Sequence, residues 1–395
     1  MQVCGVICEY NPFHRGHALH LERAKSLSGA DYIVCVMSGS VTQRGVFAHL
    51  SKWTRAEMAL MSGCDLVLEL PARFSFAPAE EFARGGVSLL DRLGVVSHLS
   101  FGCEQEALSA LDDAVQIFRE ESPTFKEALR AGLDQGLSYP RARALAARQV
   151  SGRDDLDALI ALPNASLAIE YLRALPDGIT PVPVVREGGG YHDEALGELA
   201  SATAIRAALA RGETELALSS VPRPDLLRAA LDRGDMHEEE ALTQALLYRL
   251  RTMSAADLSA IAGMEEGLEH RFLAAAKTAR TRDELILAVK SKRYTYARLS
   301  RLCMNVLLGV TRDFVRGHAA PTYARVLGFR REAQPLLRAI KEHASIPLVT
   351  KAADYDRADP LFALDVLAQD LWSLGCASPD LRVCGRDFTT GPVIL

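Results

Sequence analysis

The sequence has no long apolar run and no Cys-x-x-Cys pair among its 395 residues. A membrane-spanning helix needs about 18 consecutive apolar residues, and a secretory signal needs a basic start and a small-residue cleavage site. Neither pattern is present, so we expect a cytoplasmic protein without a membrane partner. The eight cysteines also lack the paired spacing of a zinc site. We therefore predict no protein-built metal site, and we expect Cys4, Cys8 and Cys35, which lie in apolar runs, to be buried free thiols.

A strong positive charge is also missing. The chain has 45 lysines and arginines against 50 acidic residues, a net charge of -5. This balance argues against a protein that binds nucleic acid over its whole surface. The basic residues are unevenly distributed, however, and residues 290–301 form the most basic neighbourhood. A local nucleic-acid surface there stays open.

The first half of the chain alternates short apolar runs with segments of helical periodicity. The length suits two or three domains, and the composition, 49% hydrophobic and 24% charged, is typical of globular proteins. Continuous apolar strands between helices indicate a parallel sheet covered on both faces, so we predict an α/β fold with a Rossmann-like sheet. We expect strands at residues 3–8, 32–37, 66–70, 98–102 and 181–185, and helices at residues 17–28, 52–63, 78–93 and 105–119.

The pattern changes around residues 219–224, where Ser-Ser-Val-Pro-Arg-Pro is typical of a linker. The chain beyond it is mainly helical in pattern. The clearest segment spans residues 295–310, where apolar residues recur at helical spacing, Thr295 is placed to cap the start and Gly309 lies near the end. We predict a sheet domain at residues 1–218 and a mainly α-helical domain at residues 219–395.

The most informative segment is residues 5–17, where an apolar run ends in a turn and His14 and His17 flank Gly16. A helix N-terminus attracts phosphate, glycine lets the backbone approach closely, and imidazoles donate hydrogen bonds to the oxygens around a phosphorus centre and to its leaving pyrophosphate. The segment therefore predicts a nucleoside-triphosphate site in which His14 and His17 are catalytic. The structural alternative is a pair of capping or core histidines.

A second polar segment opens a later helix with Ser201, Thr203 and Arg206. On its own this segment is an ordinary helix N-cap, because serine and threonine are common there. In combination with the histidine motif, it favours a second clamp on the β- and γ-phosphates of the nucleotide. Arg206 would supply a fixed positive charge to that clamp.

Further polar residues follow other predicted strands, at the carboxyl edge where ligands bind in parallel sheets. Ser38-Gly39 and Lys52 come after the second strand, in a loop whose position favours a substrate-facing role over a merely solvated one. Gly102 ends the fourth strand, where it would let adenine or ribose lie against the backbone. Asn164 begins a helix and Arg186 follows the fifth strand, and either has a binding role or serves as a cap or a surface charge.

A set of motifs follows in order along the chain: Glu9-Tyr10-Asn11-Pro12-Phe13-His14-x-Gly16-His17, Met37-Ser38-Gly39, Gln43-Arg44-Gly45, Lys52-Trp53-x-Arg55-Ala56-Glu57, Asp65-Leu66-Val67-x-Glu69-Leu70-Pro71 and Lys292-Arg293-Tyr294-Thr295. The His-x-Gly-His element resembles that of the nucleotidyltransferase superfamily. The whole set resembles the bacterial tRNA(Met) cytidine acetate ligases. The resemblance runs from residue 1 to about residue 310, and more loosely to the end.

The resemblance implies a two-step reaction. Acetate would attack the α-phosphate of ATP and give acetyl-adenylate and pyrophosphate, with Mg2+ accompanying the ATP. The exocyclic amine of the wobble cytidine in elongator tRNA(Met) would then attack the acetyl carbon and give N4-acetylcytidine and AMP. Such chemistry needs positioning and charge neutralisation rather than a nucleophilic side chain.

The residue patterns and the resemblance together indicate which residues contact each substrate. The expected catalytic residues are His14, His17, Arg206 and Lys52. The expected ATP contacts are Ile7, Cys8, Glu9, Tyr10, Asn11, Pro12, Phe13, His14, Gly16, His17, His20, Gly102, Asn164, Arg186, Ser201 and Thr203. Ser38 and Gly39 would line the acetate pocket, and tRNA would bind Lys290, Lys292, Arg293, Arg298 and Arg301.

Two other functions stay open at this point. A nucleotidyltransferase acting on a small phosphorylated or carboxylated metabolite is often a single short domain, so the large helical half counts against it. An ATP- and RNA-binding protein without catalysis would not need His14, His17 and Arg206 intact. Release of pyrophosphate in the presence of acetate and ATP separates the predicted enzyme from such a binding protein.

Overall fold

The computed structural model describes residues 1–104, 108–185 and 200–395, in which eight strands form one sheet. Their order is β5-β4-β1-β2-β3-β6-β7, and β8 pairs with β6. Strands β1 to β5 run parallel to one another, so the predicted parallel sheet is confirmed. The strands are β1 (Val3–Cys8), β2 (Tyr32–Ser38), β3 (Leu66–Leu70), β4 (His98–Cys103), β5 (Thr180–Val185), β6 (Ala324–Phe329), β7 (Leu348–Val349) and β8 (Val393–Ile394).

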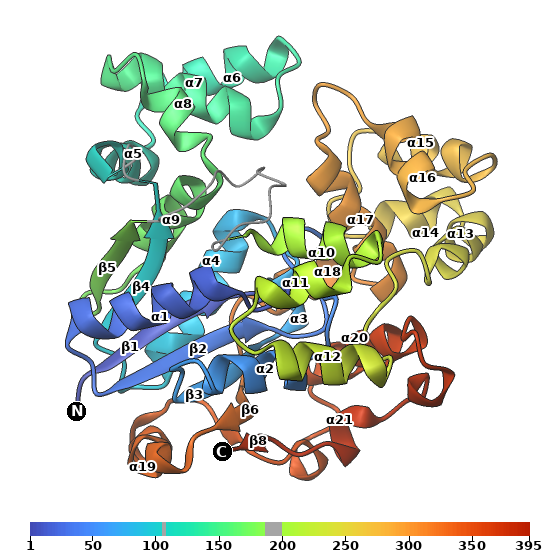
Figure 1. Ribbon diagram of the computed structural model, residues 1–395. Helices are drawn as coiled ribbons and strands as arrows, with labels where there is room; N and C mark the ends of the chain where they lie inside the picture. Colours follow the sequence, from blue (N-terminus) through green and yellow to red (C-terminus); the bar gives the residue numbers. More distant parts are fainter. Residues whose placement is uncertain (105–107, 186–199) are drawn as a thin grey trace.

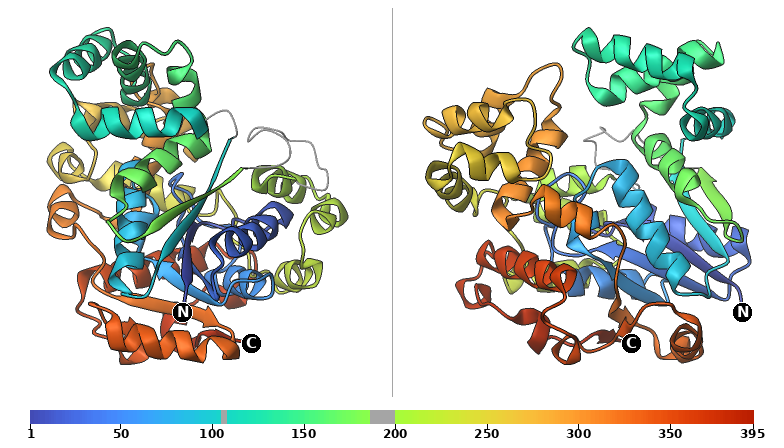
Figure 2. Two further views of the ribbon diagram at one scale, coloured as in Figure 1. Left: turned by 90° about the vertical axis from the view of Figure 1, so that its left-hand side faces the viewer. Right: turned by 180° about the vertical axis from the view of Figure 1, so that it is seen from behind.

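Helices cover both faces of this sheet, as the left view of Figure 2 shows. Alternate residues of β1 point to opposite faces, so Val3 and Ile7 join one hydrophobic core while Cys4 and Val6 join the other. The core of Cys4 and Val6 is covered by α1 (Arg15–Ser28), α2 (Lys52–Leu60), α10 (Ala202–Ala210), α11 (Thr214–Ser219) and α12 (Pro224–Asp232). The core of Val3 and Ile7 is covered by α3 (Ala72–Ser75), α4 (Ala79–Arg92), α5 (Leu108–Glu120) and α9 (Pro163–Ala174), and it extends to α6 (Pro123–Asp134), α7 (Tyr139–Ser151) and α8 (Leu156–Ile160).

A group of helices with a core of its own lies beside the sheet, drawn in yellow to orange in Figure 1. It consists of α13 (Thr243–Thr252), α14 (Ala255–Ala260), α15 (Leu268–Ala276), α16 (Arg282–Val289) and α17 (Tyr296–Leu308). The ends of α17 are as predicted, because the Thr295 hydroxyl accepts a hydrogen bond from the Arg298 N–H and Gly309 ends the helix with a φ of 68°. None of the helices formed by the described residues is long and apolar enough to cross a membrane.

The chain then returns to the sheet and adds strands that the sequence did not predict. Strand β6 pairs antiparallel with β3, and β7 and β8 pair parallel with β6. The helix α18 (Arg312–Gly317) precedes these strands in the chain. The strands lie near α19 (Gln334–His343), α20 (Pro360–Leu374) and α21 (Arg386–Thr389), in the lower part of Figure 1. We predicted no strand after residue 185, because β7 and β8 have two residues each and an arginine interrupts the apolar run of β6.

The segment predicted as a linker, residues 219–224, joins α11 to α12, and both helices pack on the same face of the sheet. The sheet therefore receives strands from both sides of residue 219. The predicted helical character of the second half holds for α13 to α17. A division into independent domains at that residue stays a prediction.

Candidate active site

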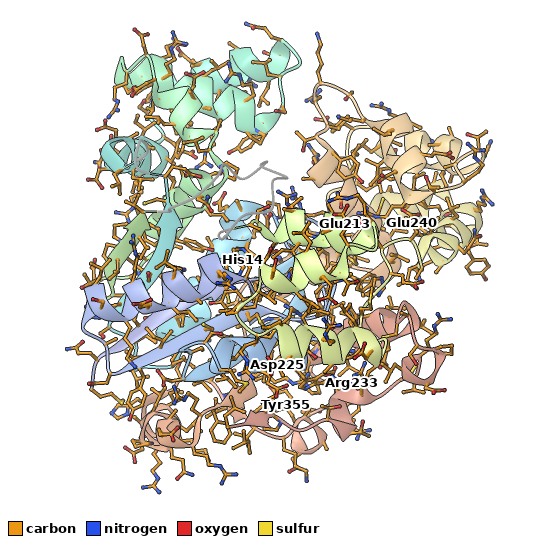
Figure 3. The ribbon with its side chains drawn as sticks, in the orientation of Figure 1. His14, Glu213, Asp225, Arg233, Glu240 and Tyr355 are labelled. Carbon is orange, nitrogen blue, oxygen red and sulfur yellow. The ribbon has the colours of Figure 1, made fainter. Side chains whose placement is uncertain are left out.

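The loops after β1 and β4 meet at one edge of the sheet. The two strands are direct neighbours, paired from Cys4 with His98 to Val6 with Ser100, although β2 and β3 come between them in the chain. Such a reversal of strand order opens a crevice at the carboxyl ends of the strands, where ligands bind in open α/β sheets. Figure 3 shows His14 at this edge, where α1 begins.

His14 and His17 lie at the start of α1 with their rings stacked, the ring centres 3.6 Å apart. The Nδ1 atom of His14 accepts a hydrogen bond from the Gly16 N–H at 3.1 Å, and the Nδ1 atom of His17 accepts one from the His14 N–H at 3.2 Å. Because Nδ1 is an acceptor in both rings, the proton of each neutral ring is on Nε2. Two Nε2–H groups at a helix N-terminus suit the binding of phosphate oxygens.

The turn before α1 supports these rings. Tyr10 has a φ of 51°, in the left-handed region, and its ring lies 4.7 Å from the ring of Phe13 and 4.8 Å from that of His17. Both Tyr10 and Phe13 are buried, so they pack behind the histidines. The structure brings the first group of predicted ATP contacts together on the end of β1, this turn and the first turns of α1, namely Ile7, Cys8, Glu9, Tyr10, Asn11, Pro12, Phe13, His14, Gly16, His17 and His20.

Arg206 joins the second polar segment to the same turn. Its guanidinium donates hydrogen bonds to the Asn11 carbonyl and, at 3.3 Å, to the Thr203 hydroxyl. The Ser201 hydroxyl caps α10 by accepting the Ala204 N–H at 3.1 Å. Ser201 therefore caps α10, its contact with ATP stays a prediction, and the structure places Arg206 beside the histidine loop. These positions fit the two-part phosphate clamp expected from the sequence.

The residues predicted on the other side of the crevice are also brought together. The His20 Nε2 atom lies 3.1 Å from the Ser100 hydroxyl on β4. Glu104, just after β4, accepts hydrogen bonds from the Asn164 side chain at 2.7 Å and from the Ala165 N–H at 3.1 Å. This ties the start of α9 to the end of β4, where Gly102 is half-buried. Arg186 lies outside the described residues.

Lys52 lies apart from the histidines in a closed ionic cluster. Its ammonium is fully buried, 2.8 Å from Glu69 and 2.7 Å from Asp387, and Arg325 lies 3.2 Å from Glu69 and 2.7 Å from Asp387. Burial alone would raise the pKa of Asp387, and the adjacent Lys52 and Arg325 reverse this shift and lower the pKa. Two cations and two carboxylates thus pair with one another here, although Asp387 Oδ2 has no hydrogen-bond partner among the described residues. A catalytic role for Lys52 stays a prediction that its placement does not support.

The predicted acetate residues, Ser38 and Gly39, lie next to this cluster. A Cβ atom on Gly39 would meet Glu69 Oε1 at 2.1 Å, so the loop approaches the cluster as closely as glycine allows. The Ser38 hydroxyl is buried and has no hydrogen-bond partner among the described residues. A buried hydroxyl without a partner is costly unless a ligand or water satisfies it. The assignment of both residues to acetate stays a prediction.

The predicted tRNA residues fall into two groups. Lys290, Lys292 and Arg293 are exposed, and Arg293 pairs with Glu266 at 2.8 Å. Arg298 is partly buried and lies over the ring of Tyr294, whereas Arg301 turns inward and donates a hydrogen bond to the Gln43 carbonyl at 3.4 Å. Burial lowers the pKa of Arg301 to about 10. The structure thus leaves Lys290, Lys292 and Arg293 at the surface and places Arg301 against the loop after β2.

Two residues of this site were not singled out as site residues from the sequence. The fully buried Arg55 donates hydrogen bonds to the carbonyls of Glu9, Ser38 and Gly39, and it thereby fixes the loops after β1 and β2 together. The His49 N–H donates to the Asn11 side chain at 2.7 Å. Arg55 lies in a quoted motif, but its role was not visible because all its acceptors are backbone atoms. Nothing in the sequence around His49 indicated a site.

The chain is similar to proteins of known function over its whole length. The family model described as HIGH Nucleotidyl Transferase matches residues 1–383. A tRNA(Met) cytidine acetate ligase from Acetivibrio thermocellus is 38% identical, with 100% of both chains covered, and one from Thermoanaerobacter sp. is 36% identical, with 98% of both covered. The crystal structure of Thermotoga maritima TmcAL without ligand matches with a TM-score of 0.93 at 32% identity, and that of the same protein bound with alpha-thio ATP with 0.92 at 31%, each covering 100% of both chains.

Proposed function

The chain belongs to the HIGH nucleotidyl transferase family and, within it, to the tRNA(Met) cytidine acetate ligases, and we propose that it joins acetate to the wobble cytidine of elongator tRNA(Met) at the expense of ATP. The observation that carries this proposal is the full-length match at 38% identity. The intact His14, Gly16 and His17 loop, with Arg206 bonded to its Asn11 carbonyl, supports it.

In the first step, an acetate oxygen attacks the α-phosphorus of ATP. A bond forms between that oxygen and phosphorus, the bond to the bridging oxygen breaks, and pyrophosphate leaves with the electron pair. The Nε2–H groups of His14 and His17 and the guanidinium of Arg206 stabilise the charge that develops on the phosphates. Adenine and ribose lie along the end of β4 near Gly102 and Asn164.

In the second step, the N4 amine of the cytidine attacks the acetyl carbon. The new N–C bond replaces the C–O bond to phosphate, AMP leaves with the electron pair, and the amine proton passes to water. The products are N4-acetylcytidine and AMP. Both steps depend on positioning and on exclusion of water, because an acyl-adenylate hydrolyses readily.

Magnesium would accompany ATP in this scheme. Among the residues that the structure describes, no three His, Cys, Asp or Glu side chains are grouped to bind a metal ion. A magnesium ion would therefore be held mainly by phosphate oxygens and water, which is its usual preference. The ion would neutralise phosphate charge when bound.

We place tRNA on the exposed basic segment of Lys290, Lys292 and Arg293, and acetate near Ser38 and Gly39. The cytoplasm is the proposed location, because tRNA is the substrate. Incubation with labelled acetate, ATP and total tRNA, followed by nucleoside analysis, tests the proposal. Labelled N4-acetylcytidine with release of pyrophosphate is expected. Pyrophosphate without labelled nucleoside would favour a small-metabolite substrate, and no pyrophosphate would favour a binding protein.

A further inference from the structure

A cavity of about 610 Å³ lies between the catalytic loops and the helices α13, α16 and α17. One wall is formed by Asn11, Arg206 and the segment from Gln43 to His49, and the opposite wall by side chains such as Thr243 and Tyr296. Asn164 and its neighbours at the start of α9 close a further side. The volume is within the range of about 300–1,000 Å³ that is typical of small-ligand sites. The cavity therefore has room for a nucleoside.

The two walls are fixed to each other before any ligand binds. Arg282 of α16 donates a hydrogen bond to the Gly45 carbonyl at 3.0 Å, and the Ser300 hydroxyl of α17 donates to the same carbonyl at 3.1 Å. Gly45 has a φ of 73°, and a Cβ atom there would lie 2.5 Å from the Arg301 nitrogen. The loop thus packs directly on the backbone of α17, and the cavity is preformed.

The cavity overlaps the predicted nucleotide site only in part. It shares Asn11, Asn164 and Arg206 with that site, but His14, His17 and Gly102 do not line it. A ligand in the cavity would approach the reacting end of an acyl-adenylate from the side of the helices. This is the side from which the second substrate has to come.

The lining suits an unstacked base. Phe47 and Tyr296 contribute aromatic rings, Leu246, Met304 and Leu307 contribute apolar surface, and Arg44, Arg282 and Thr243 contribute polar groups. Both rings are held in place, since the Phe47 ring lies 4.6 Å from the His237 ring and the Tyr296 hydroxyl donates to Asp283. Proteins that read single-stranded RNA stack splayed bases on aromatic side chains and bind the polar edges of those bases.

The exposed basic segment leads to this cavity. Lys292 and Arg293 come just before α17, and Tyr296 and Ala297 of the first turn of α17 line the cavity. We propose that this cavity receives the pyrimidine base of the acceptor nucleotide, flipped out of its RNA loop, and holds the exocyclic amine toward the acyl-adenylate. This inference rests on the proposed function and adds to it the place of the acceptor base.

Ala297→Trp tests the proposal by filling the cavity from the helix side. Ala297 is half-buried, so a larger side chain can be accommodated at the expense of the cavity. We expect the single-turnover rate of acetyl transfer to saturating tRNA to fall at least tenfold relative to the rate of acetate-dependent exchange of pyrophosphate into ATP. Ala256→Trp, at an exposed alanine of α14 that does not line the cavity, is the matched control and should keep the parent ratio.

The outcomes distinguish a failure of the cavity proposal from a failure of the proposed function. If the parent protein acetylates tRNA and Ala297→Trp has the same ratio of acetyl transfer to pyrophosphate exchange as the parent, the cavity proposal is wrong and the proposed function stands. If Ala297→Trp instead loses the exchange reaction with a raised KM for ATP, the cavity holds ATP and the proposal is overturned. If the parent forms no acetylcytidine, the proposed function itself fails. Thermal unfolding of both variants confirms that the comparison is between folded proteins.

Discussion

The two motif histidines are held by the backbone that they cap. The ring of His14 accepts the Gly16 N–H, and the ring of His17 accepts the His14 N–H. These two bonds fix the tautomer of each ring, which the sequence could not reveal, because spacing alone predicts proximity and not which nitrogen carries the proton. The same rings therefore cap the helix through Nδ1 and, in the proposed mechanism, bind phosphate through Nε2–H, so a useful substitution must separate the two roles.

His14→Asn separates them, because asparagine is among the best N-cap residues but has no Nε2–H at the position of the ring. We expect acetate-dependent exchange of pyrophosphate into ATP to fall by about 10²–10³, the usual effect of losing one preorganised donor. The melting temperature should stay close to that of the parent. His270→Asn, at an exposed position of α15, is the control and should retain the parent rate. Parent-like exchange in His14→Asn would remove the catalytic role of this histidine.

A second residue-scale prediction concerns Asp365, which is buried on α20. Burial raises the pKa of its carboxyl to about 8, the negative charge of Glu69 adds to the shift, and hydrogen bonds from Tyr323 and from the Ala72 N–H oppose it. Because the folded-state pKa lies above the ordinary value of 3.8, the folded protein binds the proton more tightly than the unfolded chain does. The stability that this proton contributes is present at low pH and is lost as the pH rises toward 8.

Asp365→Asn checks this sign, because it removes the titration and keeps the size of the side chain. We expect the unfolding free energy of the parent to decrease relative to that of the variant between pH 5 and pH 8, with a slope of at most about 1.4 kcal/mol per pH unit. Urea unfolding curves at several pH values measure this difference. A difference between the two proteins that does not change with pH would contradict the prediction.

At the scale of elements, the sequence was sufficient for β1 to β5 because each is a short, mainly apolar run with turn residues at its ends. It was insufficient for β6, where Arg325 is buried opposite Glu69 of β3. The charge of Arg325 breaks the apolar pattern, and only the carboxylates of Glu69 and Asp387 make its burial possible. The same cluster explains Lys52, because its position after a strand predicted a substrate contact, while its partners lie far along the chain.

The ionic cluster should therefore hold β6 against the parallel part of the sheet. We expect Arg325→Ala to lower the free energy of unfolding by about 3–5 kcal/mol, because it leaves Glu69 and Asp387 buried without one of their cations. Arg330→Ala, which removes an exposed pair with Glu332, should cost less than about 1 kcal/mol. Denaturant titration of both variants measures the effects. Similar small losses in both would show that the cluster does not hold this strand.

At the scale of the whole molecule, the catalytic loops and the group of helices α13 to α17 face each other across one cavity. The sequence identified both halves of this arrangement, the histidine motif and the basic segment, through local motifs. It could not show that they adjoin, because the contacts that join them run from Gly45 to Arg282 and Ser300, and most of these contacts are to backbone atoms. The proposed RNA surface and the proposed adenylate site are thus separate in the chain, whereas the two halves that carry them adjoin in space.

This separation predicts that RNA affinity and adenylate chemistry respond to different substitutions. Lys292→Ala with Arg293→Ala removes two exposed cations, although Arg293 is partly neutralised by Glu266 at 2.8 Å. We expect weaker tRNA binding and a salt dependence of the binding constant that is lower by about 1–2 in logarithmic slope, because fewer counterions are released. Acetate-dependent pyrophosphate exchange without tRNA should keep the parent rate, since neither side chain lines the crevice.

The control is Lys341→Ala with Lys351→Ala, which removes the same charge from exposed positions in the C-terminal segment around α19. If tRNA binding depends on a local surface, the control keeps the salt dependence of the parent's binding constant, and the Lys292 and Arg293 variant does not. If both double variants weaken binding equally, the effect reflects net charge, and the placement of RNA along α17 is wrong. Filter binding of elongator tRNA(Met) at a series of salt concentrations distinguishes the two results, because a local contact changes the slope whereas a change in net charge shifts all the curves alike.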